Sequence, residues 1–507
     1  MPKSSIMKIL SIHLIVTAFI FACSNLIAEN PPHSKFDSLE KYIIQYQDWY
    51  ELPGLAIGLI LDGEVKYTKG FGVMCYDSKE PVTENTLFST ASISKLFVGT
   101  AIMQLYEEKK IDLDESITKY VPYFKLRDSL FNKITIRQLL SHTSGLPDDE
   151  GEEFYSSWKN PEFDDDALKR YVKGLKTKSL ISIPGTEYIY SNIGYEILGC
   201  VISEVSGISV EEFIKKNILG QIGMQKSNML LKNVDSSLLA CPHILNENID
   251  FEINEYFPYT RRHAASGTLL SNINEMCRFA VAILNNGIID GSRILQESSI
   301  KLMLTQQNGN PAGLSWHVQQ VDSVTTLIFH AGGDPGFRTE IILIPEKAMG
   351  VVVMTNSWEH QIEPLAYKAL NYMLEDDVQD WFTFYHGSTW KIMRNNNTEN
   401  AVDKIKEIVS KNGFENFHPA ILNQHSNLLQ DLGKTLDAIE FKKLNIEFYP
   451  KTFQLYNSLA ELYVYLGDTK NAIVNYEKSI ELKRDNNAAI DKLKTITTNN
   501  QVQINPL

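Results

Sequence analysis

A strand–turn–strand pattern stands near the start of the chain, where residues 55–67 read LAIGLILDGEVKY. The apolar half is long enough for a buried strand, and Asp62-Gly63 supplies the positive φ angles of a tight hairpin. A second such pattern, IILIPEKAMGVVVM, occupies residues 341–354, and amphipathic helical patterns such as residues 192–206 lie between the two. Strands at both ends with helices between them predict an α+β fold: one antiparallel sheet, closed by its terminal strands and flanked by helices.

The composition is that of a globular protein, with 43% hydrophobic and 22% charged residues over 507 positions. Two or three domains are expected at this length. Acidic residues outnumber basic ones by 62 to 48, which gives a net charge of −14. We expect no nucleic acid partner, because phosphate binding needs basic patches. The five cysteines show no C-x-x-C spacing, so neither a zinc knuckle nor a disulfide framework is implied.

An export signal is predicted at the N-terminus. Lys3 and Lys8 precede an apolar run at residues 9–22, and polarity rises sharply after position 28. The run is too short for a membrane span and is typical of a secretory signal. Two cleavage sites remain open: one after Ala28, and one after position 22 that leaves Cys23 to carry a lipid anchor. We expect an exported protein, either periplasmic or held at the membrane as a lipoprotein.

The chain changes character after residue 380. The asparagine-rich residues 395–400 indicate a linker, which we place at 381–400. Beyond it, helical periodicity dominates, and Leu432-Gly433 recurs 34 positions later as Leu466-Gly467. This spacing resembles the tetratricopeptide repeat, in which small residues let paired helices approach closely. An unrelated pair of helical hairpins is the alternative.

The predicted organisation is therefore a signal at residues 1–28, a main domain at 31–380, the linker, and an all-α repeat domain at 401–495. Two repeats are fewer than an independent solenoid usually needs. We therefore expect the repeat domain to pack on the main domain.

Chemistry is indicated first by Ser92-Ile93-Ser94-Lys95. Seven S-x-x-K tetrads occur in the chain, but this one follows the strand-like residues 87–90 and opens an apolar helix. A serine at a helix start lies near free backbone N–H groups, and a lysine three positions later shares its helix face. Burial would lower the pKa of that lysine and let it accept the serine proton. The motif predicts Ser92 as a nucleophile and Lys95 as its activator.

Two further motifs add functional groups. Tyr190-Ser191-Asn192 is the only Y-x-N sequence in the chain, and His330-Ala331-Gly332-Gly333 is the only H-x-G. A tyrosine near a cation can approach the phenolate form and act as a base, while an asparagine amide can bind a substrate carbonyl. Glycines at the end of a strand let a substrate lie against the backbone, where an N–H can stabilise an oxyanion.

The order and spacing of these motifs resemble the serine β-lactamase and D,D-peptidase superfamily, in its class C-like branch, over residues 38–374. The run ITIRQLLSHTSGLP at residues 134–147 carries the resemblance on its own. The resemblance implies that Ser92 forms an acyl-enzyme and that Lys95 and Tyr190 transfer protons, with the acylation base left open between them. It implies a substrate-binding set made of Asn192, His330, Gly332 and Gly333, with the N–H groups of Ser92 and Gly333 as the oxyanion hole. It implies no metal and no organic cofactor.

The strand motif departs from the Lys-Thr/Ser-Gly pattern of many relatives, because His330 and Ala331 replace the cation and the hydroxyl that bind a substrate carboxylate. Histidine is mostly neutral above its reference pKa of about 6.5, and alanine has no donor. We therefore expect feeble β-lactam hydrolysis and cleavage of an ester or amide, in a cell-wall peptide, a D-amino acid peptide or a small ester. His142 is expected to be structural.

Two alternatives stay open. One is a β-lactamase or penicillin-binding protein proper. The other is an inactive binding or scaffold protein whose repeats bind a protein partner. The complete set of Ser92, Lys95, Tyr190 and Asn192 favours an active enzyme, since a buried lysine is costly to keep without a use.

Overall fold

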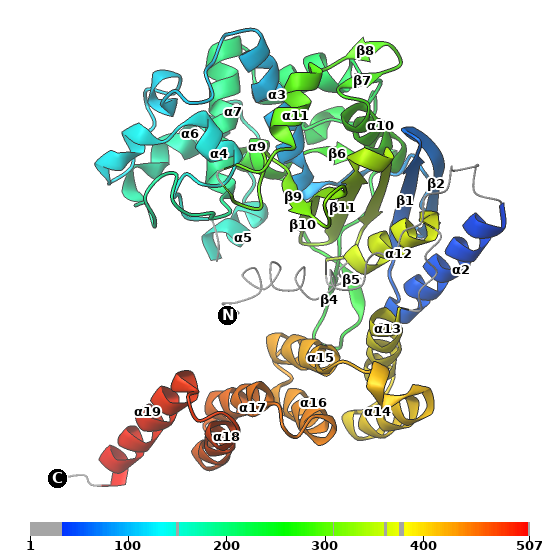
Figure 1. Ribbon diagram of the computed structural model, residues 1–507, viewed down its shortest axis with the longest axis vertical. Helices are drawn as coiled ribbons and strands as arrows, with labels where there is room; N and C mark the ends of the chain where they lie inside the picture. The colour runs from blue at the N-terminus through cyan, green and yellow to red at the C-terminus, as the bar shows by residue number, and fades with distance from the viewer. Residues whose placement is uncertain (1–32, 149–151, 308, 359–361, 375–379, 505–507) are drawn as a thin grey trace.

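The computed structural model describes residues 33–148, 152–307, 309–358, 362–374 and 380–504. A larger body is built around an antiparallel sheet, and Figure 1 shows a smaller body of helices below it. The predicted export signal and Cys23 lie outside the described residues. Of the helices described, none combines the length and the apolar character that a membrane crossing requires.

Six antiparallel strands form the main sheet, in the order β2-β1-β12-β11-β10-β9. They are β1 Gly54–Leu61, β2 Glu64–Gly72, β9 His317–Gln320, β10 Thr326–Asp334, β11 Phe337–Ile344 and β12 Met349–Thr355. β1 and β12 pair side by side, with Leu55 opposite Thr355 and Ile57 opposite Val353. The prediction of one antiparallel sheet closed by its terminal strands is confirmed.

The central strands are buried on both faces, which is why they read as apolar runs without polar alternation. Ala56 of β1 belongs to one core, whereas Leu55 and Ile57 belong to a second core on the opposite face. Helix α10, Ile273–Leu284, packs over the first face. The other face is covered by α12 and α2, as Figure 1 shows. The sheet therefore lies between two helical layers.

The other named elements of the larger body position the site or enclose its core. They are α2 His33–Tyr50, β3 Phe88–Ser89, α3 Ser94–Glu107, α4 Ile136–Leu140, α5 Glu152–Lys159, α6 Ala167–Gly174, α7 Asn192–Ser206, α8 Val210–Ile214, α9 Ala264–Gly267, β6 Leu270–Ser271, β7 Ile288–Ile289, β8 Ser292–Arg293, α11 Glu297–Met303 and α12 Glu363–Met373. Helices α3 and α7 pack against each other, and both contact α9.

Residues 381–400 are mostly helical, so the prediction of a linker there is wrong. Helix α13 spans Trp381–Arg394 and begins where the Asp380 side chain accepts a backbone hydrogen bond at 3.0 Å. Its Trp390 side chain is buried in the core that also contains α2. The polar residues that suggested a linker make only a short break before α14, because the Asn397 side chain caps that helix.

Antiparallel helix pairs follow α13. The helices are α14 Thr398–Asn412, α15 Pro419–Asp431, α16 Thr435–Phe448, α17 Phe453–Tyr465, α18 Thr469–Leu482 and α19 Asn487–Ile504. α15 packs on α16 and α17 on α18, and Gly433 and Gly467 follow the first helix of each pair with φ angles of 78° and 76°. Glycine is favoured at such angles, so the 34-residue spacing arises because the same type of turn occurs in both helix pairs. The prediction of a small all-α domain with tetratricopeptide-like repeats is confirmed.

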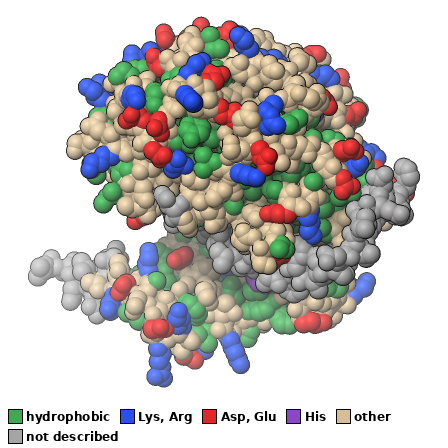
Figure 2. All heavy atoms as spheres, turned by 45° about the horizontal axis from the view of Figure 1, so that its top comes forward, with side chains coloured by type: hydrophobic (Ala, Val, Ile, Leu, Met, Phe, Trp, Pro, Cys, Tyr) green, Lys and Arg blue, Asp and Glu red, His purple; other side chains and the backbone are tan. Residues whose placement is uncertain are grey.

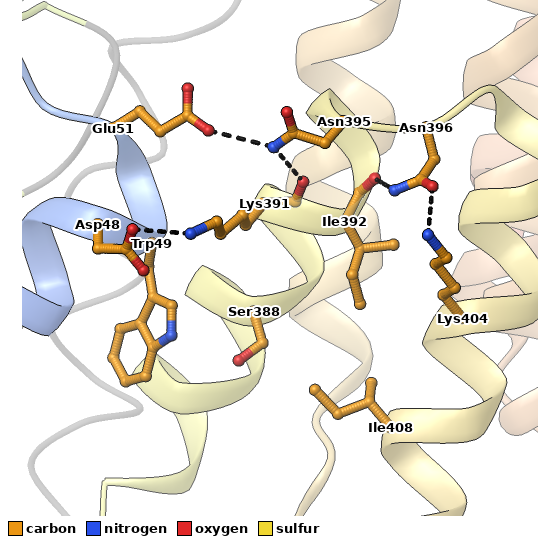
Figure 3. Close-up of a pocket in the computed structure, with 10 residues that line it drawn as sticks. All are labelled: Asp48, Trp49, Glu51, Ser388, Lys391, Ile392, Asn395, Asn396, Lys404 and Ile408. Atoms are coloured by element: carbon orange, nitrogen blue, oxygen red, sulfur yellow. Dashed lines mark hydrogen bonds and ion pairs between the residues drawn. The ribbon is translucent and has the colours of Figure 1, made fainter.

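The helical body is docked on α2, as Figure 3 shows. Lys391 of α13 lies with its Nζ 2.7 Å from an Asp48 carboxylate oxygen of α2. Gly387 allows the two helices to touch, because a Cβ there would come within 2.8 Å of Trp49. A groove of about 470 Å³ remains between α2, α13 and α14. One apolar core runs through both bodies, which confirms that the repeats pack on the domain before them.

A hairpin of the larger body also reaches the helical body. It consists of β4, His243–Leu245, and β5, Phe251–Ile253. Asp250 in its turn accepts a hydrogen bond from Arg394 at 3.2 Å. The Arg394 guanidinium also lies 5.6 Å from the Phe251 ring centroid, so α13 contacts both α2 and this hairpin.

A disulfide joins Cys75 to Cys241, immediately before the hairpin. No disulfide was expected from the cysteine spacing, because 166 positions separate the two cysteines and spacing carries no signal over such a distance. Cys200 and Cys277 are free and buried.

The surface in Figure 2 carries acidic and basic side chains in alternation. The net charge of −14 is therefore not gathered into one acidic field on that face. Mixed charge of this kind is typical of a soluble surface.

Gly387→Ala tests the junction between the two bodies. The added Cβ would meet Trp49 at 2.8 Å, so the helices must separate. We expect the thermal midpoint to fall by roughly 2–6 °C, as overpacked contacts usually cause. Gly174→Ala is the matched control, because a Cβ on this helical glycine meets nothing within 4 Å. Equal midpoints for the two variants, measured by calorimetry, would contradict the docking.

Candidate active site

Ser92 lies in a short 3₁₀ turn, Ala91–Ile93, between β3 and α3. Helix α3 begins at Ser94, so Ser92 precedes the helix rather than opening it. Ala91 has a φ of 47°, a conformation that residues with a Cβ adopt rarely. Ser92 is partly exposed while Ala91 and Ile93 are buried. The turn therefore presents the serine on the rim of the core, as a nucleophile requires.

Lys95 is completely buried on the first turn of α3. Its Nζ donates hydrogen bonds to Ser92 Oγ at 2.9 Å and to the Ser266 carbonyl at 2.8 Å. Burial lowers the pKa of the Lys95 amine to about 8, against the opposing charges of Asp148, Glu196 and Asp334. A substantial fraction of this amine is therefore neutral near pH 8 and can accept a proton from Ser92.

Tyr190 lies on the other side of the serine. The neighbouring Ser92 hydroxyl acts to lower the Tyr190 pKa, and the Tyr190 ring centroid lies 5.2 Å from Lys95 Nζ. Burial nonetheless raises the Tyr190 pKa well above 10. This direction is opposite to the one expected for a phenol brought toward phenolate by a nearby cation, because desolvation is the largest contribution. The two pKa directions favour Lys95 over Tyr190 as a base.

His142 holds the tyrosine in place. Its imidazole stacks on the Tyr190 ring, with centroids 4.3 Å apart and planes 25° apart. Its Nδ1 accepts the Ser191 N–H at 3.1 Å, which places the proton of the neutral ring on Nε2. Burial lowers the His142 pKa well below 6.5. The structural role predicted for His142, that of satisfying a backbone group, is confirmed.

Asn192 is the first residue of α7, directly after the Tyr190 segment. Ser191 caps the helix by accepting the Gly194 N–H, and its hydroxyl donates to the Pro147 carbonyl at 2.8 Å. The Asn192 N–H donates to Asp148 at 2.8 Å, and the residue is partly exposed. The helix start therefore fixes the position of Asn192 relative to Tyr190.

His330 lies on β10, beyond the point where that strand pairs with β9. Its ring is 2% exposed and lies 6.4 Å from the Tyr190 ring, centroid to centroid. Nδ1 is 2.7 Å from the Ala331 carbonyl, so Nδ1 carries the proton of the neutral ring. Burial lowers the His330 pKa well below 6.5. The residue that replaces the usual lysine is therefore uncharged.

Gly332 and Gly333 bring the strand against the nucleophile turn. A Cβ on Gly332 would lie 2.2 Å from the Thr90 carbonyl oxygen, so only glycine fits. A Cβ on Gly333 would instead approach Trp358 at 3.3 Å and Arg338 at 3.4 Å, on the other face of the strand. The edge of β10 thus runs beside Ser92, Lys95 and Tyr190, and the structure brings together all the motifs singled out in the sequence.

Several residues of the site were missed from the sequence. Ser266 supplies a carbonyl to Lys95, and Asp334 accepts a hydrogen bond from Ser89 at 2.8 Å. Burial raises the pKa of Asp334 to about 7. Ser266 and Asp334 stand in the sequence without a distinguishing signal, and only their contacts in the structure connect them with the site. In the described part of the chain, no group of three or more His, Cys, Asp or Glu side chains is placed to hold a metal ion.

Comparison with known proteins agrees with this geometry. A family profile described as Beta-lactamase matches residues 39–371, and one described as Tetratricopeptide repeat matches residues 453–486. The chain belongs to the beta-lactamase family. Members of this fold family are serine hydrolases.

Curated relatives in the beta-lactamase family are distant. Protein flp of Staphylococcus aureus strain MW2 is 28% identical over 313 residues, which cover 60% of each chain. Penicillin-binding protein 4* of Bacillus subtilis is 26% identical over 62% of this chain and 70% of its own length. The chain thus spans about 60% of the length of the first of these relatives.

Solved structures share the fold of the larger body. The octameric penicillin-binding protein homologue from Pyrococcus abyssi is 29% identical, with a TM-score of 0.59 over 67% of this chain and 77% of its own. A class C beta-lactamase is 23% identical, with a TM-score of 0.55 over 68% of this chain and 98% of its own. At this distance the second likeness concerns the fold alone.

The pH dependence of Ser92 reactivity tests Lys95 as the base. With a Lys95 pKa of about 8, the rate of labelling by a fluorophosphonate should rise about tenfold per pH unit and level off above pH 8. Lys95→Arg should abolish the reaction, because arginine stays protonated. A labelling rate that is constant from pH 6 to 9 would rule out this role.

Gly332→Ala tests the contact between β10 and the nucleophile turn. The added methyl group must displace the Thr90 carbonyl, and with it the turn that carries Ser92. We expect the labelling rate to fall by about 10²-fold or more, because a small misplacement of the reacting groups has effects of that size. Gly267→Ala is the control, since a Cβ there meets nothing within 4 Å. Similar rates for the two variants would contradict the argument.

Proposed function

We propose that this protein is an exported serine hydrolase that cleaves an ester or amide through an acyl-enzyme on Ser92. The observation that carries the proposal is the buried Lys95 amine, which donates to Ser92 Oγ at 2.9 Å while its pKa is lowered to about 8. A surface lysine would be protonated near neutral pH and could not act as a base.

In the proposed acylation, Ser92 Oγ attacks the substrate carbonyl while its proton passes to Lys95 Nζ. The N–H groups of Ser92 and Gly333 stabilise the oxyanion, and each such donor is typically worth about 3–4 kcal/mol. When the carbonyl–leaving group bond breaks, Tyr190 protonates the departing nitrogen or oxygen and recovers its proton from Lys95. Water then attacks the Ser92 ester by the same route, which releases the acid and restores the serine.

The proposed substrate class follows from β10. A neutral His330 and the methyl group of Ala331 offer no cation and no hydroxyl to a substrate carboxylate. An ester or amide without an obligatory carboxylate, such as a small ester or a D-amino acid or cell-wall peptide, suits this edge better than a β-lactam.

A β-lactamase or penicillin-binding activity proper is the second candidate, and one observation favours it. The Arg338 guanidinium packs on the Trp358 ring at 4.8 Å and lies 3.4 Å from the position of a Gly333 Cβ. A permanent cation beside the oxyanion strand favours substrates that carry a carboxylate.

Export of the mature protein is part of the proposal. Disulfides persist in oxidising compartments, and Cys75–Cys241 lies, partly exposed, within the larger body. We place the protein in the periplasm or, through Cys23, on the membrane as a lipoprotein. The repeats are proposed to bind a protein partner, which their exposed Val464 and Tyr465 side chains support.

A substrate panel tests the catalytic assignment. p-Nitrophenyl esters, D-amino acid p-nitroanilides and nitrocefin should be turned over by wild type, the first two classes faster, and Ser92→Ala should lose at least about 10³-fold in kcat/KM. Ser298→Ala is the matched control, because Ser298 begins another S-x-x-K tetrad, whose Lys301 is exposed and paired with Glu297. Faster turnover of nitrocefin would favour the second candidate. No Ser92-dependent turnover and no fluorophosphonate labelling would favour a scaffold.

A further inference from the structure

Among the described residues, the hydrogen-bond acceptors of the Lys95 ammonium group are neutral: the Ser92 hydroxyl and the Ser266 carbonyl. The Lys95 side chain is wholly buried, and the rings of Tyr190 and Tyr195 lie 5.2 and 5.6 Å from its Nζ. A buried cation of this kind needs negative charge close by, even without direct contact. The source of that charge therefore matters to the chemistry.

Glu196 is connected to Lys95 through the backbone of α9. It lies on α7, one turn after Asn192, and its side chain is 0% exposed. Its Oε2 accepts the Ala265 N–H at 3.1 Å, while Lys95 donates to the carbonyl of the next residue, Ser266. The two side chains thus hold successive residues of the same short helix, α9.

Glu196 has a further contact with the buried His263. Within the described residues its Oε1 has no hydrogen-bond partner, and the His263 Nδ1 lies 3.7 Å away, which makes an ion pair only when the imidazole is protonated. Holding the Ala265 N–H requires only one acceptor, which a glutamine also has. A glutamate differs from a glutamine in that it can carry a negative charge. At this position the charge would lie in the buried core, next to the α9 residue that accepts the Lys95 hydrogen bond.

We propose that Glu196 is a positioning residue of the active site: it holds the Ser266 carbonyl against Lys95 and supplies buried negative charge that keeps the lysine a strong base. The proposal rests on the proposed function only for its catalytic consequence. The effect of the Glu196 charge on the basicity of Lys95 does not depend on the identity of the substrate.

Other groups also face Lys95. Asp148 from the loop before α5 and Asp334 at the end of β10 raise its pKa together with Glu196. His142 and His330 are neutral neighbours whose own protonation Lys95 opposes. Because Asp148 and Asp334 remain when Glu196 is neutralised, the effect of a single substitution should be partial.

The direct test measures the Lys95 pKa by NMR on protein labelled with [ε-¹³C]lysine, with the signal assigned by its loss in Lys95→Arg. Wild type should titrate near pH 8, and Glu196→Gln should titrate lower by about one unit, since the ammonium form loses a buried counter-charge. Glu275→Gln is the matched control: Glu275 is a buried carboxylate on α10 that binds the Lys226 and Ser227 N–H groups. Its variant should leave the Lys95 titration unchanged.

The activity test uses the sign of the same shift. Because only neutral Lys95 accepts the serine proton, a lower pKa moves the acid limb of kcat/KM to lower pH. Glu196→Gln should therefore be about 3- to 10-fold more active than wild type toward p-nitrophenyl esters at pH 6, and less active at pH 9 because its base is weaker. A merely structural role would lower activity equally at both pH values and leave the limb in place.

An unchanged Lys95 titration in Glu196→Gln would overturn the inference. Should that variant not fold, Glu196→Leu is a second neutral replacement with the same expected shift, and Glu196→Asp, which keeps the charge, should titrate near wild type. If the Lys95 pKa moves as expected but wild type shows no Ser92-dependent turnover, the proposed function fails and the charge relation between Glu196 and Lys95 stands.

Discussion

The burial of one lysine amine organises the catalytic body. Lys95 can occupy the core only because Ser92 and Ser266 accept its hydrogen bonds and carboxylates surround it at longer range. The first acceptor requires the strained turn at Ala91, and the second requires α9 to lie against both α3 and α7. The same burial lowers the pKa of the amine. The feature that is hardest to accommodate in the fold is therefore the one to which we assign the reactivity of the serine.

The functional motifs recognised in the sequence were each formed by residues close together in the chain. Ser92 and Lys95 lie within one helical turn of each other, and the apolar runs of β1 and β12 predict strands that are buried on both faces. What was missed depends on contacts between distant segments. The Cys75–Cys241 disulfide, the packing of α13 on α2, and Glu196 beneath the lysine leave no periodic signal. The protonation of Tyr190 was misjudged for the same reason, since spacing shows a nearby cation but does not show how completely the ring is desolvated.

Positions on β10 differ in how strictly the structure limits the side chain. Gly332 admits no side chain, because the Thr90 carbonyl occupies the space. His330, by contrast, lies in a position where charge is optional, and burial has made it neutral. Backbone geometry on this strand is thus set by its close approach to the turn that carries Ser92. In the proposed function, the side chains of the strand can alter which substrate is recognised without altering how it is cleaved.

The docking of α13 on α2 has a consequence for how such a chain can change over generations. Gly387 must stay small to fit Trp49, and Lys391 faces Asp48, although more than three hundred positions separate the two helices. Exchange of the helical segment between genes would leave α2 with an uncovered apolar side, unless the beginning of the gene were exchanged as well. Substitutions on α2 and α13 are therefore expected to be accepted together, because each helix covers the other.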